Sequence, residues 1–459
     1  MKIPYPNLKR LIASTFITLS ILLPLQLDSQ NIVHRDIEIE EALSKISADS
    51  MRVYIDDLLR FKTRHNLSKR SDKYVGIGAA ADYLEERVNS FRKDNEEFVS
   101  VERVDFRAGG AGSRLGREIT LTNIIATIKG SGPDNRVIAL LAHYDSRIDD
   151  NSDSTSFAPG ANDNGSGVAA LLEISRILSA MRLPATIKVM FLSGEEHGLL
   201  GAAHMANMAQ IERWNLIAVL NNDMIGNTQS SETDTRNNTV VRVFSENIPF
   251  TETENQTRDR VFNSSENDSP SRQLARYIKE TGERYVENIS VKLIYRNDRF
   301  GRGGDHTPFS RKGFTAVRIC EYYENYNRTH QKVGEMGGIN FGDMPEGVDF
   351  EYLRKNCSVN LSSVINLSKA PNPPTMVHTD ISSLGNFTKI SWRAPSIGEE
   401  PYGYYLLIRE TDSPVWQRKI FVKGESATIP LSKDNYFFAV QSVNKIGNES
   451  LAQFSTGER

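Results

Sequence analysis

The sequence VIALLAHYD, residues 137–145, decides the fold of the larger part of this chain. Its first six residues are continuously apolar, as expected of a strand that is buried on both faces of a sheet. A polar segment, GANDNGSG at 160–167, and a helical stretch at 166–183 follow it. The order of apolar strand, polar segment and helix recurs at 187–208, where IKVMFL precedes SGEEHG. This alternation predicts an α/β fold with a mostly parallel central sheet flanked by helices.

Further elements extend the pattern in both directions. We expect additional strands at 121–128, 216–220, 240–244, 291–295 and 314–319. Apolar residues at helical spacing predict two amphipathic helices within 37–65, a third beginning near Gly76 and another at 270–281. Between 227 and 270 the chain is mostly polar and broken by one strand, so we expect a long surface excursion there.

A proline cluster, APNPP at 370–374, ends the helix before it and marks a predicted domain boundary. Short alternating strands with Trp392 and Tyr404 follow, which favours a small all-β sandwich. This segment resembles a fibronectin type III module in Trp392 and in the corner 431–436. We expect an α/β domain at 31–369 and the sandwich at 370–459, the latter as a spacer or as a module that binds a glycan, another protein or a cell surface.

The first thirty residues have the order of an export signal. Lys2, Lys9 and Arg10 precede an uncharged, largely apolar stretch at 11–25, which polar Asp28 follows. A stretch of about 15 residues is short of the roughly 20 that a membrane-spanning helix needs, which favours cleavage over a retained N-terminal anchor. We expect a signal peptide at 1–30, a secreted or periplasmic mature chain and no membrane span within it.

Charge and cysteine content restrict the class of protein. The net charge of -3 produces no field that would favour nucleic acid as a partner. Cys320 and Cys357 are too few for a disulfide scaffold or a four-thiolate metal site. An exported chain can pair them, and two buried thiols acting as small apolar residues are an equal alternative.

Acidic and imidazole side chains collect directly after the apolar strands, where ligands gather in an open α/β sheet. The segments are HYD at 143–145, AND at 161–163, EE at 195–196 and NND at 221–223. Buried carboxylates repel one another, so such a cluster requires cations or protonation. Nitrogen and oxygen ligands suit zinc. We expect two ions roughly 3.5 to 4 Å apart, a separation at which a carboxylate and a water bridge both.

These ordered segments resemble the M28 family of metallopeptidases, the co-catalytic zinc aminopeptidases, over roughly residues 40–370. The resemblance implies one zinc on His143 and Asp223, a second on Glu196 and His330, and Asp163 as the bridge. Glu195 matches the general base of that family. Asp145 stands two residues beyond His143, so in an extended segment it projects to the same side, where it can accept the second imidazole N–H.

The departures from the family pattern concern the last ligand and its surroundings. The usual continuation after this histidine is absent, since the chain reads HQKV at 330–333. Another group must therefore orient the His330 ring. His306, in GGDHTPF at 303–309, is an alternative ligand or, more simply, a residue of the site wall. Asn164 replaces a second aspartate that many relatives carry, and Arg299 and Arg302 are read as solvated loop charges that can also favour acidic side chains.

The resemblance implies a zinc-dependent aminopeptidase that acts on peptides with a free N-terminus through a metal-activated water and Glu195. Carboxypeptidase action, glutaminyl cyclisation and a non-catalytic receptor-like role are the alternatives. Glu196 and His197 are not part of an H-E-x-x-H helix, and no G-x-S-x-G elbow occurs, which disfavours a zincin or a serine hydrolase. We also expect that deletion of 371–459 leaves hydrolysis largely intact.

Overall fold

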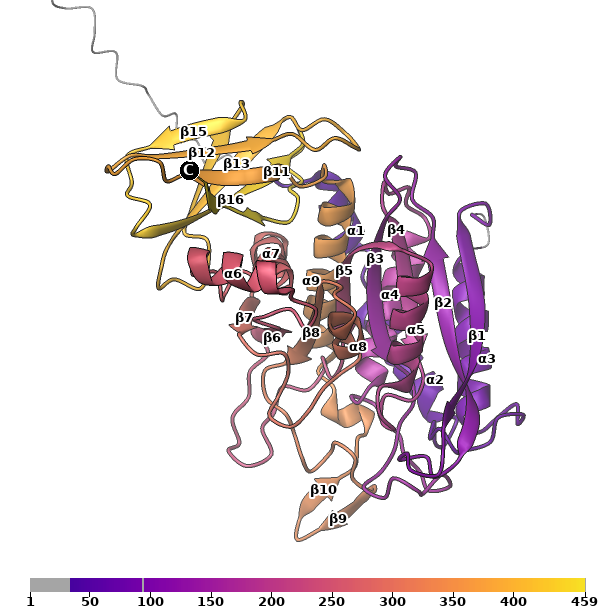
Figure 1. Ribbon diagram of the computed structural model, residues 1–459. Helices are drawn as coiled ribbons and strands as arrows, with labels where there is room; N and C mark the ends of the chain where they lie inside the picture. The colour runs from indigo at the N-terminus through magenta and orange to yellow at the C-terminus, as the bar shows by residue number, and fades with distance from the viewer. Residues whose placement is uncertain (1–33, 93–94, 459) are drawn as a thin grey trace, which may run out of the picture.

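An eight-stranded sheet forms the centre of the larger part of the chain (Figure 1). The computed structural model describes residues 34–92 and 95–458, so the expected signal peptide lies outside the described residues. The strand order is β1-β2-β4-β3-β5-β8-β6-β7. The bounds are β1 (Val99–Gly109), β2 (Glu118–Ile128), β3 (Arg136–His143), β4 (Thr186–Leu192), β5 (Asn215–Asn222), β6 (Val240–Ser245), β7 (Ser290–Ile294) and β8 (Ala316–Glu321). Strands β4, β3, β5 and β8 run parallel to one another, which confirms the mostly parallel sheet.

Helices cover both faces of this sheet. They are α1 (Ile37–Ser44), α2 (Ala48–Leu59), α3 (Ile77–Phe91), α4 (Gly165–Leu178), α5 (Leu200–Ile211), α6 (Glu254–Asn263), α7 (Pro270–Tyr285), α8 (His306–Arg311) and α9 (Phe350–Lys369). Alternate residues of β3 face opposite layers. Ile138 and Leu140 belong to the core that contains α2, α4, α7 and α9, whereas Ala139 and Leu141 pack with α5 and α8. Because both faces are covered, every residue of β3 is buried.

Strand β1 and helix α6 are among the elements that the sequence did not predict. Strand β1 is an antiparallel edge strand beside β2, and its largely exposed residues lack the apolar run by which the other strands were predicted. Within the expected excursion at 227–270, residues Glu254–Asn263 form α6. Thr253 and Gln256 make a capping box at its start, and none of its residues is buried. Local capping therefore orders a helix whose polar composition indicated a loop.

The C-terminal part forms two four-stranded sheets, β15-β12-β11-β18 and β14-β13-β16-β17. Their bounds are β11 (Thr375–Asp380), β12 (Thr388–Arg393), β13 (Gly403–Glu410), β14 (Arg418–Val422), β15 (Ser426–Ile429), β16 (Tyr436–Val443), β17 (Gln453–Phe454) and β18 (Thr456–Glu458). Trp392 and Tyr404 meet edge to face in the core between the sheets, with ring centroids 5.4 Å apart. The small all-β sandwich is confirmed, while its likeness to a fibronectin type III module and the domain boundary stay predictions.

The sandwich lies beside α6 and α7 (Figure 1), and buried ion pairs join it to α7 and the segment before it. Asp268, whose side chain is 1% exposed, pairs with Arg276 of α7 at 3.0 Å and with Arg409 of β13 at 2.6 Å. Arg284 of α7 donates to Glu449 at 3.0 Å. Breaking a buried pair leaves an uncompensated charge, so these contacts hold the sandwich in one place.

Three smaller features complete the fold. A hairpin of β9 (Gly334–Met336) and β10 (Ile339–Phe341) and the short helix η1 (Pro345–Gly347) lie between β8 and α9. Cys320 and Cys357 are both free and buried, so they act as small apolar residues and do not pair. Within 34–92 and 95–458, we find no helix with the length and apolar character needed to cross a membrane.

Candidate metal centre and active site

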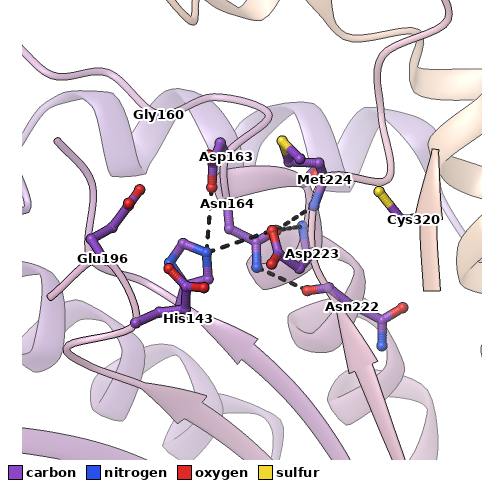
Figure 2. A network of polar contacts seen from close by, with 12 residues as sticks. His143, Gly160, Asp163, Asn164, Glu196, Asn222, Asp223, Met224 and Cys320 are labelled. Atoms are coloured by element: carbon purple, nitrogen blue, oxygen red, sulfur yellow. Dashed lines mark hydrogen bonds and ion pairs between the residues drawn. The ribbon is translucent and has the colours of Figure 1, made fainter. Parts of the chain in front are cut away.

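The candidate site lies at the carboxyl ends of the parallel strands β3, β4 and β5. His143 is the last residue of β3, the pair Glu195 and Glu196 follows β4, and Asp223 follows β5. Asp163 comes from the loop before α4, and Figure 2 shows it beside His143 and Asp223. Parallel strands present their carboxyl ends at one sheet edge, so segments distant in sequence converge there.

Asn164 and Asp343 hold the loop that carries Asp163. The Asn164 side chain caps α4 by accepting the N–H of Gly167 at 3.1 Å, and it donates to the carbonyl of Asn222 at 2.8 Å. Asp343 accepts the N–H of Asp163 at 2.7 Å. This loop is therefore fixed both to the end of β5 and to the segment before α9. Asn164, which stands in place of a second aspartate, is a structural clamp in this chain.

Asp163 lies between two imidazoles and presents a different oxygen to each. Its Oδ1 is 3.3 Å from Nε2 of His143, and its Oδ2 is 2.9 Å from Nε2 of His330. Nε2 of His143 is also 3.7 Å from Oδ1 of Asp223, and Nε2 of His330 is 2.8 Å from Oε1 of Glu196. A carboxylate placed in this way has the geometry of a bridge between two cation positions, as the sequence-based ligand set requires.

Ligand atoms of these residues are close enough together to share an ion. One group comprises His143, Asp163 and Glu196, and another comprises His143, Glu195 and Asp223; within each group the ligand atoms lie within 4.8 Å of one another. All the donors are imidazole nitrogens and carboxylate oxygens, the set that catalytic zinc sites use. The residues present therefore fit zinc.

The pKa shifts within the cluster indicate that its carboxylates attract positive charge. Burial would lower the pKa of His143, yet the carboxylates of Asp145, Asp163 and Asp223 raise it well above its ordinary value. Burial likewise opposes a charged His330, and Glu196 and Asp163 raise its pKa to about 10. For Asp163, burial would raise the pKa, but His330 and His143 lower it well below the usual range. A metal ion at Nε2 of either ring would supply the charge that these carboxylates attract.

Glu195 differs from its neighbour Glu196 in environment. Burial first, and then the nearby charges of Glu196 and Asp223, raise the pKa of Glu195 well above its ordinary value. It lines a cavity of about 570 Å³ together with Asp163, Glu196, Asp223 and His330. A carboxyl group that holds a proton more readily than usual, beside the metal-donor atoms and open to a cavity, has the properties of a general base and acid.

Asp145 supports the site in a way that differs in part from the expectation. The nearer acceptor for Nδ1 of His143 is the main-chain carbonyl of Asp145 at 3.1 Å, while the carboxylate Oδ1 lies 3.6 Å away. The carboxylate instead accepts the backbone N–H groups of Glu195 at 3.3 Å and Glu196 at 3.2 Å, and Nδ2 of Asn66 at 2.6 Å. Asp145 is thus a positioning residue for both glutamates.

Comparisons with known proteins identify the family of this chain. The model of peptidase family M28 matches residues 123–344. A probable zinc metalloprotease of Leptosphaeria maculans is 37% identical over 418 residues, which cover 91% of this chain and 96% of the relative. The chain belongs to peptidase family M28.

Further relatives extend this result. A probable zinc metalloprotease of Pyrenophora tritici-repentis is also 37% identical, over 91% of this chain and 97% of its own length. Among solved structures, the LapA aminopeptidase of Legionella pneumophila has a TM-score of 0.50 and 17% identity, covering 73% of this chain and 77% of that one. At this identity the likeness shows that the two share a fold.

Two arginines of this M28 family member contact the candidate ligands and were missed in the sequence analysis. Arg318, in β8, is fully buried, and its Nη2 lies 3.1 Å from Oδ2 of Asp223. Nε of Arg147 donates to Oε2 of Glu196 at 2.7 Å, and its Nη2 is 2.7 Å from Nδ1 of His330. Arg147 therefore contacts the His330 ring, but a guanidinium only donates hydrogen bonds, so it does not replace an aspartate that would accept the Nδ1–H of a metal-binding imidazole. A charged residue inside the apolar strand AVRIC was the available signal for Arg318.

The remaining predicted residues of the M28 site lie around the ligand cluster. His306 is fully buried, its Nε2 contacts the carbonyl of Asn297 at 2.8 Å, and it is absent from both groups of metal-donor atoms. Its neighbour Asp305 is also fully buried, and burial raises the pKa of Asp305 to about 8. Arg299 is paired with Glu324 at 2.6 Å, whereas Arg302 is exposed at the rim of the cavity. His306 does not line the cavity, and the two interpretations of its role stay predictions.

Proposed function

We propose that this M28 family member is an exported zinc-dependent aminopeptidase that hydrolyses the N-terminal bond of peptides with a free amino terminus. The observation that carries the proposal is the position of Glu195, which lines the cavity beside a bridging carboxylate and two imidazoles. The names of the relatives, probable zinc metalloproteases, support zinc as the metal.

We take the ligand roles from the resemblance to family M28, and the distances between the side chains support them. His143 and Asp223 would hold one zinc, Glu196 and His330 the other, and Asp163 would bridge them. When bound, the zinc ions polarise the substrate carbonyl and lower the pKa of a bound water toward about 7. Glu195 takes the proton of the attacking water and then delivers it to the leaving amine. Asp145 keeps Glu195 in place through the backbone.

A second candidate function is carboxypeptidase action by the same centre. The observation that favours it is the presence of Arg114 and Arg302 among the cavity residues. Neither has an acidic partner within 4 Å in the part of the chain that the structure describes, although Nη1 of Arg114 donates to the carbonyl of Glu196 at 3.4 Å, so both guanidinium groups have N–H donors for the C-terminal carboxylate of a peptide. Aminopeptidase action requires that these arginines instead face solvent or later residues of the substrate.

Metal analysis and a matched set of peptides test the proposal. We expect about two zinc ions per chain, cleavage of peptides with a free N-terminus, and no cleavage once that terminus is acetylated. Glu195→Gln should keep its zinc and lose turnover by at least about 100-fold, the usual contribution of a general base. Glu173→Gln is the control, since Glu173 is a fully buried glutamate outside the cavity.

Other outcomes would select an alternative. Cleavage of acetylated peptides that is abolished by amidation of the C-terminus would establish the carboxypeptidase. A chain that binds one zinc and cyclises N-terminal glutamine would be a glutaminyl cyclase. A well-folded protein that binds no zinc would support the receptor-like role. Export is tested separately, by sequencing the N-terminus of the mature protein.

A further inference from the structure

The two candidate ligands that do not bridge, Asp223 and Glu196, share one arrangement. Oδ1 of Asp223 faces His143, and its Oδ2 is 3.1 Å from Nη2 of Arg318. Oε1 of Glu196 faces His330, and its Oε2 accepts a hydrogen bond from Nε of Arg147 at 2.7 Å. Each carboxylate therefore has one oxygen directed at an imidazole and the other bound to a guanidinium.

Each of the two guanidinium groups also donates to a second partner outside the ligand set. Nη1 of Arg318 binds both carboxylate oxygens of Asp298, at 3.0 and 3.1 Å. Nη1 of Arg147 donates to the carbonyl of Ile148 at 3.0 Å. The side chains of Arg318 and Arg147 are 0% and 13% exposed, so water competes little for these hydrogen bonds. The guanidinium groups are fixed parts of the site.

This arrangement limits what each carboxylate offers to a cation. A carboxylate binds a metal through one oxygen or through both. An oxygen that accepts a charge-assisted hydrogen bond from a buried guanidinium has less charge to donate to a metal, so binding through the other oxygen is favoured. Catalytic zinc differs from structural zinc in keeping a position free for water or substrate. The number of oxygens that Asp223 and Glu196 supply decides whether this position stays free.

We propose that Arg318 and Arg147 are positioning residues that restrict Asp223 and Glu196 to one metal-binding oxygen each. When zinc is bound, this would leave a coordination position on each ion for water or substrate. The proposal rests on the ligand roles of the proposed function. It also explains why two largely buried arginines lie beside a site that binds zinc. Without the arginines, both oxygens of each carboxylate would be available to the metal, and the open position would close.

The proposal and a purely structural role predict opposite changes in metal retention. If the arginines only supported the ligands, their removal would loosen the ligands, and zinc would leave faster. If they restrict coordination, their removal adds an oxygen ligand, so zinc leaves more slowly while turnover falls. The expected combination is slower zinc loss, lower kcat and a nearly unchanged KM.

The test uses the full chain loaded with zinc or with Co²⁺ as a spectroscopic probe. Arg147→Met removes one guanidinium, and Arg147→Lys keeps a single cationic donor. Arg318→Met is combined with Asp298→Asn, because Asp298 would otherwise keep only the longer ion pair with Arg299, at 3.4 Å. Arg260→Met is the control for Arg147, because Arg260 pairs with Glu252 at similar side-chain exposure, 16% and 11%, away from the site. Arg276→Met is the control for Arg318, because Arg276 also forms a buried ion pair, with Asp268.

Coordination number from X-ray absorption, the rate of zinc transfer to a chelator, kcat and KM are measured on each protein. We expect Arg147→Met to gain an oxygen ligand, to release zinc several-fold more slowly, and to lose about tenfold or more in kcat, the range that groups supporting metal ligands show. The Lys variant should recover part of the loss, and both controls should match the wild type.

Two results would overturn the proposal. One is faster zinc release with an unchanged coordination number in the Arg147→Met protein and in the double variant. The other is wild-type coordination and kcat in both. Because Arg318 does not contact either imidazole, the double variant separates carboxylate restriction from the contact with His330. A wild-type protein that binds no zinc would refute the proposed function itself, before any variant is compared.

Discussion

Replacing Asp145 with asparagine exchanges one carboxylate oxygen for an NH₂ group and should disturb the whole glutamate loop. The Asp145 carboxylate is fully buried and accepts three hydrogen bonds, from Asn66 Nδ2 and from the backbone N–H groups of Glu195 and Glu196. An amide has one accepting oxygen, so its NH₂ group must face at least one of these donors. Loss of one hydrogen bond to a buried charged group costs about 1.5 to 3 kcal/mol. The loss also displaces Glu195 relative to the metal-donor atoms.

Chemical denaturation, zinc content and steady-state kinetics of Asp145→Asn test this reasoning. We expect the free energy of unfolding to fall by the amount above and kcat to fall by about 10- to 100-fold, the range for groups that support metal ligands. Asp343→Asn is a useful comparison, because Asp343 also accepts backbone N–H groups, those of Asn162 and Asp163. An Asp145→Asn protein with wild-type stability and kcat would show that the carboxylate does not hold the loop.

Two further predictions concern the sandwich. Burial opposes a charged Glu449, but Lys419 and Arg284 lower its pKa to about 2. A pKa depressed in the folded state stabilises above the ordinary value of about 4.5 and loses that effect as the pH falls toward 2. Glu449→Gln should therefore melt below the wild type at pH 7, with a gap that narrows under acid; a gap independent of pH would contradict this. Deletion of 371–459 should lower the melting temperature, because it removes the partners of Asp268 and Arg284, while kcat of the folded fraction stays near wild type, since every residue lining the cavity precedes 371. A well-folded, zinc-loaded truncation without activity would show that the sandwich takes part in hydrolysis.

Local sequence patterns were sufficient to predict most of the sheet and the acidic part of the site. The parallel strands are continuous apolar runs, because both of their faces are buried, and such runs are visible without tertiary information. Strand β1 and helix α6 carry no comparable pattern. Strand β1 is a largely exposed edge strand, and α6 is defined by a capping box on a polar segment. Strand β1 forms because it pairs with β2, and helix α6 forms because a capping box begins it.

The sequence by itself determined that His143, Asp163, Glu195, Glu196 and Asp223 meet, because each follows a strand or opens a helix at one edge of a parallel sheet. Only the tertiary structure decided which other side chains contact these residues. Arg147 contacts His330 across 183 residues, and Arg318 contacts Asp223 across a strand pair. It also decided that the Asp145 carboxylate supports the glutamate loop while its carbonyl faces His143. Such contacts depend on loop paths and side-chain rotamers, which are set by packing against distant segments and leave no periodic trace in the sequence.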